Sequence, residues 1–199
     1  MLHAINRPVK RSLILAALVT SWIFSMPWPM QCATLERLSL DDMITRSTTI
    51  VRGKVTGSWA AYTGSVIYTH YRISVSESFK GEAGATVEVM TPGGAVKNAR
   101  QTFSGSPLLN EGDEFVFFLW TGKGGITWIT GLTQGLFAIS NSATGERMAS
   151  RSASRELMLD AVTSRPVKDG ALTMGLSALR ARIAATMAAQ GAVKTGGVK

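Results

Sequence analysis

Alternation of apolar and polar residues dominates the middle of the chain and predicts β-strands. From Ile67 to Phe79, odd positions are mostly apolar, whereas even positions carry side chains such as His70 and Arg72. This period of two is typical of a strand with one buried face. A continuous apolar run follows at 114–120 and predicts a strand covered on both faces. Together the patterns predict strands at residues 49–59, 67–79, 86–90, 99–103, 114–120, 126–130 and 136–140.

Six or seven short strands at about ten-residue spacing, joined by glycine-rich turns, predict a mainly β domain over residues 34–140. Glycines inside the first strand, Gly53 and Gly57, favour a small closed barrel because glycine permits sharp strand bends. A β-sandwich is the alternative. The alternation further predicts which strand residues are covered by protein and which face water. We expect buried side chains at Tyr71, Ile73, Val75, Val87, Val89, Phe115 and Phe117, and exposed ones at Arg52, Lys54, Arg72 and Glu88.

Helices are expected only at the two ends of this domain. Ser39 is a natural N-cap for a short helix, because Asp42 can complete a capping box with it. The tail, residues 141–199, is basic and rich in serine and alanine, with helices expected at Arg155–Val162 and Ser177–Ala189. The second helix has an apolar stripe that we expect to dock on the barrel, with a membrane-surface helix as the alternative. That stripe consists of Leu176, Leu179, Ile183 and Met187.

The first 33 residues have the organisation of a secretory signal peptide. A basic start is followed by the uncharged run Leu13–Met26 and then by small residues before Ala33, the preferred cleavage site. An uncleaved membrane anchor and lipidation of Cys32 are the alternatives. Cleavage would remove His3 and Cys32 and leave a net charge of about +5, so the sequence predicts export to the periplasm, the cell surface or the medium. No stable membrane span is expected after cleavage.

Composition argues against most catalytic and metal chemistry. One cysteine excludes multi-cysteine metal sites, and no group of three or four His, Cys, Asp or Glu residues has workable zinc spacing, so neither a metal nor a cofactor is expected. His70, the one histidine after residue 33, lies in mid-strand, and the chain has no G-x-S-x-G motif for a serine nucleophile. Residues 49–140 carry seven basic and six acidic side chains, a poor electrostatic footprint for nucleic acid.

Two resemblances to known families bear on the fold. Ile50-Val51-Arg52-Gly53-Lys54-Val55 and Glu77-Ser78-Phe79-Lys80-Gly81 resemble the opening of the netrin-like module of tissue inhibitors of metalloproteinases, an OB-type barrel. Residues 34–140 also resemble uncharacterised secreted bacterial proteins with a small OB-like barrel. The matching segments are Thr91-Pro92-Gly93-Gly94, Asn110–Leu119 and Gly131-Leu132-Thr133-Gln134-Gly135. The second resemblance implies fold and export, but no activity.

The sequence thus predicts an exported, non-enzymatic binding module. Its candidate site is the polar face of the first hairpin, where positive charges gather beside an aromatic ring and could meet an anionic ligand or a protein partner. A netrin-like protease inhibitor is the alternative function, and a hydrolase that uses His70 is a weaker one. The residues of the candidate face are Arg52, Lys54, Tyr68, His70 and Arg72.

Overall fold

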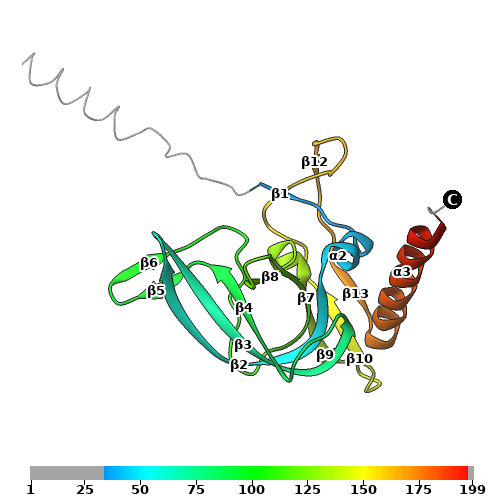
Figure 1. Ribbon diagram of the computed structural model, residues 1–199, viewed down its shortest axis with the longest axis horizontal. Helices are drawn as coiled ribbons and strands as arrows, with labels where there is room; N and C mark the ends of the chain where they lie inside the picture. Colours follow the sequence, from blue (N-terminus) through cyan, green and yellow to red (C-terminus); the bar gives the residue numbers. More distant parts are fainter. Residues whose placement is uncertain (1–33, 197–199) are drawn as a thin grey trace, which may run out of the picture. The chain divides into compact units, whose positions relative to one another are not determined.

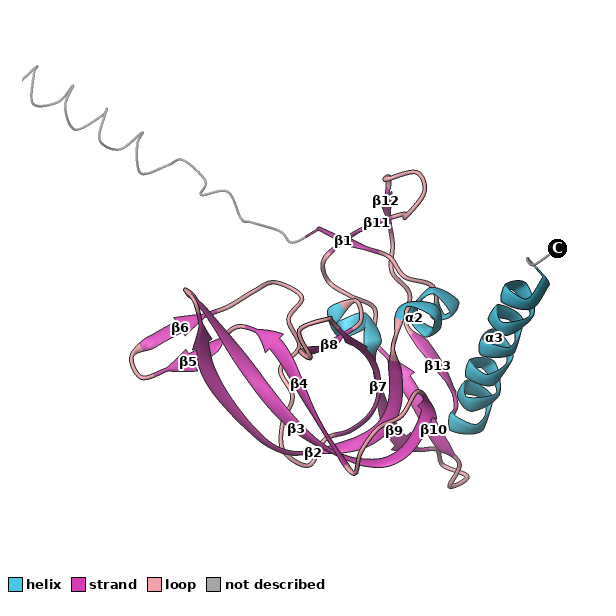
Figure 2. Cartoon of the chain, in the orientation of Figure 1, coloured by secondary structure: helices cyan, strands magenta, loops and turns pink. Residues whose placement is uncertain are grey.

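The computed structural model describes residues 34–196, with side-chain surroundings described as far as residue 192. This part of the chain is mainly β with two α-helices (Figures 1 and 2). The predicted signal peptide lies outside the described residues, together with His3, Cys32 and the cleavage site at Ala33. Within the described residues, no helix is long and apolar enough to cross a membrane.

Eight strands form the largest sheet, in the order β13–β10–β9–β7–β2–β3–β4–β8. Small sheets are formed by β1, β11 and β12 and by β5 and β6. The strand bounds are β1 Thr34–Glu36, β2 Thr49–Thr63, β3 Val66–Lys80, β4 Thr86–Pro92, β5 Gly94–Val96, β6 Ala99–Gln101, β7 Glu114–Thr121, β8 Thr127–Ile129, β9 Leu136–Asn141, β10 Arg147–Arg151, β11 Leu157–Leu159, β12 Pro166–Val167 and β13 Leu172–Gly175.

Five strands of this sheet are hydrogen-bonded in a ring. Strand β8 pairs with β4 through Met90 and Trp128, and it also pairs with β7, so that β7, β2, β3, β4 and β8 close on themselves. Strands β8 and β9 both pair with the same edge of β7. Strand β9 pairs with Phe115–Phe117, and β8 pairs with Leu119–Thr121 further along the strand. Strands β9, β10 and β13 then continue the sheet away from the ring.

The long hairpin β2–β3 is curved (Figure 2), and glycine permits the close approach of its strands. A Cβ atom at Gly53 would lie 2.6 Å from Cγ2 of Ile73 and 2.7 Å from the carbonyl oxygen of Ser74. The register also shifts between Val55 and Gly57, where β2 carries an extra residue. Such a bulge reverses which face the following residues occupy. Trp59, an apolar residue at an odd position of the strand predicted at 49–59, therefore lies opposite His70 and is 40% exposed.

Two apolar cores lie on opposite faces of β2 and β7. Val116 and Phe118 belong to one core, and Phe117 and Leu119 to the other, so the prediction that this strand is covered on both faces is confirmed. Four of the predicted buried residues are buried, but Val75, Val87 and Phe115 are only half-buried. Of the predicted exposed residues, Lys54, Arg72 and Glu88 are exposed, and Arg52 is half-buried because it forms ion pairs.

The short helix α2, Leu40–Arg46, begins where the sequence predicts. Ser39 accepts a hydrogen bond from the backbone N–H of Asp42, and the Asp42 carboxylate accepts one from the Ser39 N–H, which completes the capping box. At its other end, Nζ of Lys80 donates to the Ile44 carbonyl oxygen over 2.6 Å. Burial lowers the pKa of Lys80.

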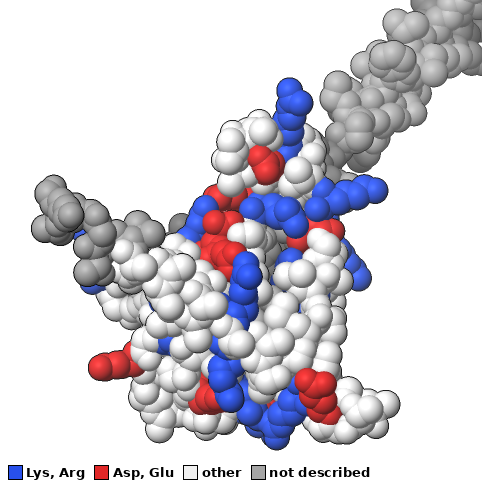
Figure 3. Space-filling view, turned by 90° about the vertical axis from the view of Figure 1, so that its right-hand side faces the viewer, with Lys and Arg blue, Asp and Glu red and all other residues white. Residues whose placement is uncertain are grey.

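The C-terminal helix α3, Leu176–Gly196, packs on the core that contains α2. Leu176, Leu179 and Ile183 are buried there and Met187 is half-buried, which confirms the predicted docking of the stripe. Charged side chains of both signs are intermingled on this side of the molecule (Figure 3). Arg180 pairs with Glu77 and Arg182 with Asp41, so the arginines of α3 meet acids from other elements.

The predicted helix at Arg155–Val162 is wrong. This segment contains β11, which pairs in parallel with β1 and antiparallel with β12. A buried ion pair joins the residues that flank this segment: Arg151 donates to the two carboxylate oxygens of Asp169 over 2.7 and 3.0 Å. The apolar residues of 155–162 do not form one buried stripe, because Met158 is buried whereas Leu157 is 43% and Val162 is 90% exposed. The segment 141–199 thus contains four strands in addition to α3.

Truncation of Ile73 tests the core inside the ring. Ile73 is fully buried, and its side chain packs closely against Gly53. We expect Ile73→Ala to lower the free energy of unfolding by about 2–5 kcal/mol, because lost burial and a residual cavity add. Chemical denaturation measures this loss, with Val162→Ala, at a 90% exposed position, as the control. A loss below about 1 kcal/mol for Ile73→Ala would contradict the assigned core.

Candidate functional site

Three residues of the predicted face contact tryptophan rings: His70 and Arg72 contact Trp59, and Tyr68 contacts Trp128. His70 stacks on Trp59 with ring centroids 5.0 Å apart, and the Arg72 guanidinium lies 5.6 Å from the Trp59 ring centroid. Nδ1 of His70 lies 2.8 Å from a carboxylate oxygen of Glu88. Tyr68 makes an edge-on contact with Trp128, at a centroid distance of 5.5 Å. Glu88 therefore already compensates part of the positive charge of this face.

The other two predicted residues do not join this cluster. Arg52 donates from Nε to Glu114 over 2.6 Å, and it lies opposite Glu77 in the register. Glu77 and His70 are seven positions apart on β3, which is about 23 Å of extended strand. Lys54 is exposed and lies opposite Ser74 in the register. Sequence alternation found the shared face, but it could not reveal that ion pairs occupy one end of it.

The surroundings of His70 give it no nucleophile. In the described part of the chain its ring contacts are Trp59 and Glu88, and no serine or threonine hydroxyl is hydrogen-bonded to it. His70 lines none of the pockets described below. Among the residues that the structure describes, no three His, Cys, Asp or Glu side chains are gathered so that they could hold a metal ion.

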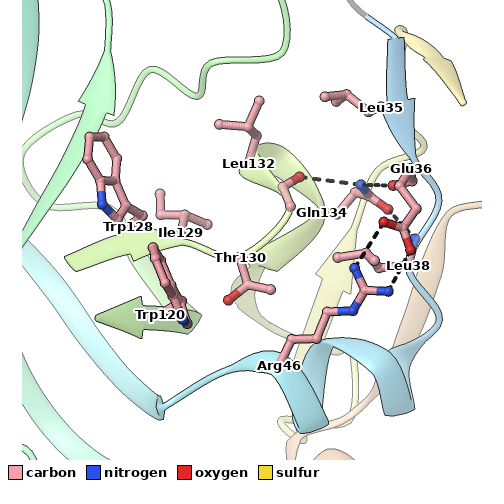
Figure 4. A pocket seen from close by; sticks show the side chains of 11 residues that line it. Leu35, Glu36, Leu38, Arg46, Trp120, Trp128, Ile129, Thr130, Leu132 and Gln134 are labelled. Atoms are coloured by element: carbon pink, nitrogen blue, oxygen red, sulfur yellow. Dashed lines mark hydrogen bonds and ion pairs between the residues drawn. The ribbon is translucent and has the colours of Figure 1, made fainter. Parts of the chain in front are cut away.

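A different site lies where β7 and β8 meet β1 and α2, and we call it the Trp pocket (Figure 4). Its volume is about 570 Å³, which lies within the ~300–1,000 Å³ typical of ligand pockets. Trp120 and Trp128 lie opposite each other in the β7–β8 register and form one wall. Trp120 is 47% exposed, so a ligand in the pocket could reach its ring. The lining residues are Leu35, Glu36, Leu38, Arg46, Trp120, Trp128, Ile129, Thr130, Gly131, Leu132 and Gln134.

Gln134 fixes the wall that faces the tryptophans. Its amide is buried, and its Oε1 accepts from the Leu38 N–H while its Nε2 donates to the Glu36 carbonyl, each over 2.9 Å. A buried amide with both ends bonded holds its partners in a defined position. Gln134 comes from the short 3₁₀ helix Leu132–Gly135, which connects β8 to β9. The amide thus ties β1 to the ring.

The charged groups of the pocket are paired with each other. Arg46 donates to the two carboxylate oxygens of Glu36 over 3.0 and 2.5 Å. The hydrogen bond from Arg46 holds the pKa of Glu36 below its ordinary value, and the same bond raises the pKa of Arg46. Because both side chains are almost half exposed, solvent screens this pair. The remaining surface of the pocket is largely apolar.

Leu132 reaches the pocket from an unusual backbone conformation. Its φ is +57°, and the preceding Gly131 has a φ of +66°. Left-handed backbone is uncommon for a residue other than glycine, asparagine or aspartate, and it often occurs at functional sites. The strain places an apolar side chain at the pocket where a glycine or an asparagine would suit the turn better. This conformation favours a functional interpretation of the pocket.

A second pocket, of about 400 Å³, lies near β5 and β6. Its lining includes Thr69, Tyr71, Arg100, Phe103 and Leu108, and it contains no carboxylate. Arg100 is its one charged residue, and within the described residues it forms no ion pair. Compared with the Trp pocket it has less volume and no strained residue other than glycine. We therefore treat the Trp pocket as the candidate site.

The sequence did not point to this pocket. Leu35, Trp120 and Leu132 come from segments far apart in the chain, and each looks like an ordinary strand or turn residue. An early signal was available in Trp120 and Trp128, since two tryptophans on neighbouring strands are an uncommon use of large apolar side chains. No protein-family model matches this chain, and no curated protein matches it either.

Proposed function

We propose that this chain is an exported, non-enzymatic binding protein, built on a small OB-like β-barrel, which holds an apolar group in the Trp pocket. The observation that carries the proposal is the pocket itself, which combines two tryptophans and several leucines with charges that pair internally. Ligand pockets are usually concave, mostly apolar and furnished with few polar groups. The predicted anionic ligand has less support, because Glu88 and Glu114 already pair with His70 and Arg52.

The barrel is supported by the ring of five hydrogen-bonded strands. A five-stranded, partly open barrel is the architecture of OB-type folds. Internal glycine at Gly53 and the bulge near Gly57 are devices that let long strands curve. Both features lie in the segment whose sequence resembles the netrin-like module.

Export is supported by the sequence of residues 1–33, and intact-mass analysis of the protein outside the cytoplasm tests it. A mass that corresponds to a Thr34 start would support cleavage after Ala33. A start at Cys32 would favour the alternative of a netrin-like inhibitor, because such inhibitors chelate zinc through an N-terminal cysteine. A full-length chain recovered from the cytoplasm would contradict export.

Removal of one pocket wall is expected to abolish most apolar binding. The probe is the dye 1-anilinonaphthalene-8-sulfonate, titrated into the full chain and followed by fluorescence. We expect Trp120→Ala to weaken binding about tenfold, since a large apolar surface is lost. Leu132→Asn should weaken it as well, and asparagine tolerates the left-handed backbone of this position.

The matched control is Trp59→Ala, which removes an exposed tryptophan that lines the second pocket and not the Trp pocket. It should bind the dye as the unaltered chain does. Circular dichroism would verify that all three variants keep the fold. Equal dye affinity in the Trp120, Leu132 and Trp59 variants would exclude the Trp pocket as the binding site.

A further inference from the structure

Strand β1 is the edge of its sheet, and its outward backbone groups lie at the Trp pocket. In the parallel pairing with β11, the N–H of Arg37 donates to the carbonyl oxygen of Leu159. The register shows that the backbone groups of Leu35 point toward β11 as well. Because backbone groups alternate along a strand, those of Thr34 and Glu36 point to the opposite edge. Leu35 and Glu36 both line the pocket.

Gln134 already occupies part of this outward edge. Its amide bonds the Glu36 carbonyl and the Leu38 N–H, two groups that are two residues apart on one edge. In a parallel sheet, a single residue of the neighbouring strand bonds such a pair in the same way. The side chain therefore stands in for one residue of an added strand. The next such pair along the edge is the Glu36 N–H and the Thr34 carbonyl, and neither has a partner in the described part of the chain.

We propose that the ligand of the Trp pocket is an extended polypeptide segment, which pairs with the free edge of β1 and inserts one large apolar side chain between the tryptophans and Leu132. This inference rests on the proposed function of the pocket. An unpaired edge strand is a template for another strand, and adding a strand is a common mode of peptide recognition. Backbone hydrogen bonds then give affinity, and the pocket gives preference for a side chain.

The chemistry of the segment follows from the walls of the site. Trp120, Trp128, Leu132 and Leu35 favour an aromatic or a large aliphatic side chain. Residues on either side of the inserted one would point away from the pocket, because side chains alternate along an extended chain. The Glu36–Arg46 pair offers one charge of each sign and therefore selects no net charge in the ligand. The expected motif is one large apolar residue between small or β-branched polar ones.

Two substitutions at one position separate backbone pairing from side-chain effects. Glu36→Pro removes the outward N–H, whereas the bonds of Leu35 and Arg37 to β11 stay intact. Proline is tolerated on an edge strand where the N–H faces away from the sheet. Glu36→Ala is the matched control, since it removes the same carboxylate from Arg46 but keeps the N–H. Circular dichroism and thermal melting would show whether both variants retain the fold.

The probe is a random-peptide library selected on the full chain, followed by calorimetry with the selected peptides and with the dye. We expect enriched peptides to contain a large apolar residue, and to bind Glu36→Pro about tenfold more weakly than Glu36→Ala. Equal affinity for the two variants would overturn strand addition. Strand addition would also be overturned if no peptide were selected while the dye still bound the unaltered chain more tightly than Trp120→Ala. That result would leave the proposed function of the pocket standing. Failure of the dye test would instead remove the pocket function itself.

Discussion

Ending the chain after Gly175 is expected to destabilise the protein severely. The deletion removes α3 and with it the buried side chains of Leu176, Leu179 and Ile183. At ~1.5–3 kcal/mol for each large apolar side chain, the loss is roughly 5–9 kcal/mol. A whole domain is stable by only about 5–15 kcal/mol. We therefore expect a melting temperature far below that of the full chain, or no cooperative transition.

The same deletion distinguishes docking from membrane association of α3. The matched control is a chain that ends after Gln190, which keeps all three buried residues and should melt close to the full chain. Binding to vesicles that contain anionic phosphatidylglycerol should be equal for the two truncated proteins and the full chain. Unchanged melting together with lost vesicle binding in the Gly175 variant would mean that α3 acts at a membrane surface.

Local patterns were sufficient to predict most of the strands of the ring. Alternation in 67–79 and the continuous apolar run in 114–120 each report directly on which faces are buried, and the structure agrees with both. The bulge after Val55 was not predictable, because an extra residue in a strand leaves no mark on composition. As a consequence, Trp59 shares a face with His70 and is 40% exposed, although it is apolar and at an odd position like Val51 and Val55.

Pairings between distant segments account for the rest of what the sequence did not predict. Helix α3 has no acid to pair with its arginines, and only the fold brings Asp41 to Arg182 and Glu77 to Arg180. The Trp pocket likewise depends on the Gln134 amide meeting β1, at a sequence separation of 96–98 residues. Sequence patterns report on faces and periods within one element, and they carry no information about which elements meet.

Removal of the carboxylate of Asp169 is expected to cost about 3–5 kcal/mol of unfolding free energy. The side chains of Arg151 and Asp169 are 4% and 1% exposed, so Asp169→Asn leaves a buried guanidinium without its counter-charge. The double substitution Arg151→Met with Asp169→Leu should recover most of the loss, because an apolar pair of similar size avoids the desolvation cost. Urea denaturation at neutral pH measures both values, with Glu82→Gln, an exposed carboxylate-to-amide change, as the control.

The pH dependence of the same pair gives a second test. Burial alone would raise the pKa of Asp169, but hydrogen bonds from Arg151 and from the Ser154 N–H outweigh it and hold the pKa below the ordinary 3.8. A carboxylate with a lowered pKa in the folded state stabilises the fold above its ordinary pKa, and this contribution is lost as the pH falls through the lowered value. The stability difference between the unaltered chain and Asp169→Asn should therefore be full near pH 7 and shrink below about pH 4. A difference that stays constant into that acidic range would show that the ion pair is not what stabilises the segment between β10 and β13.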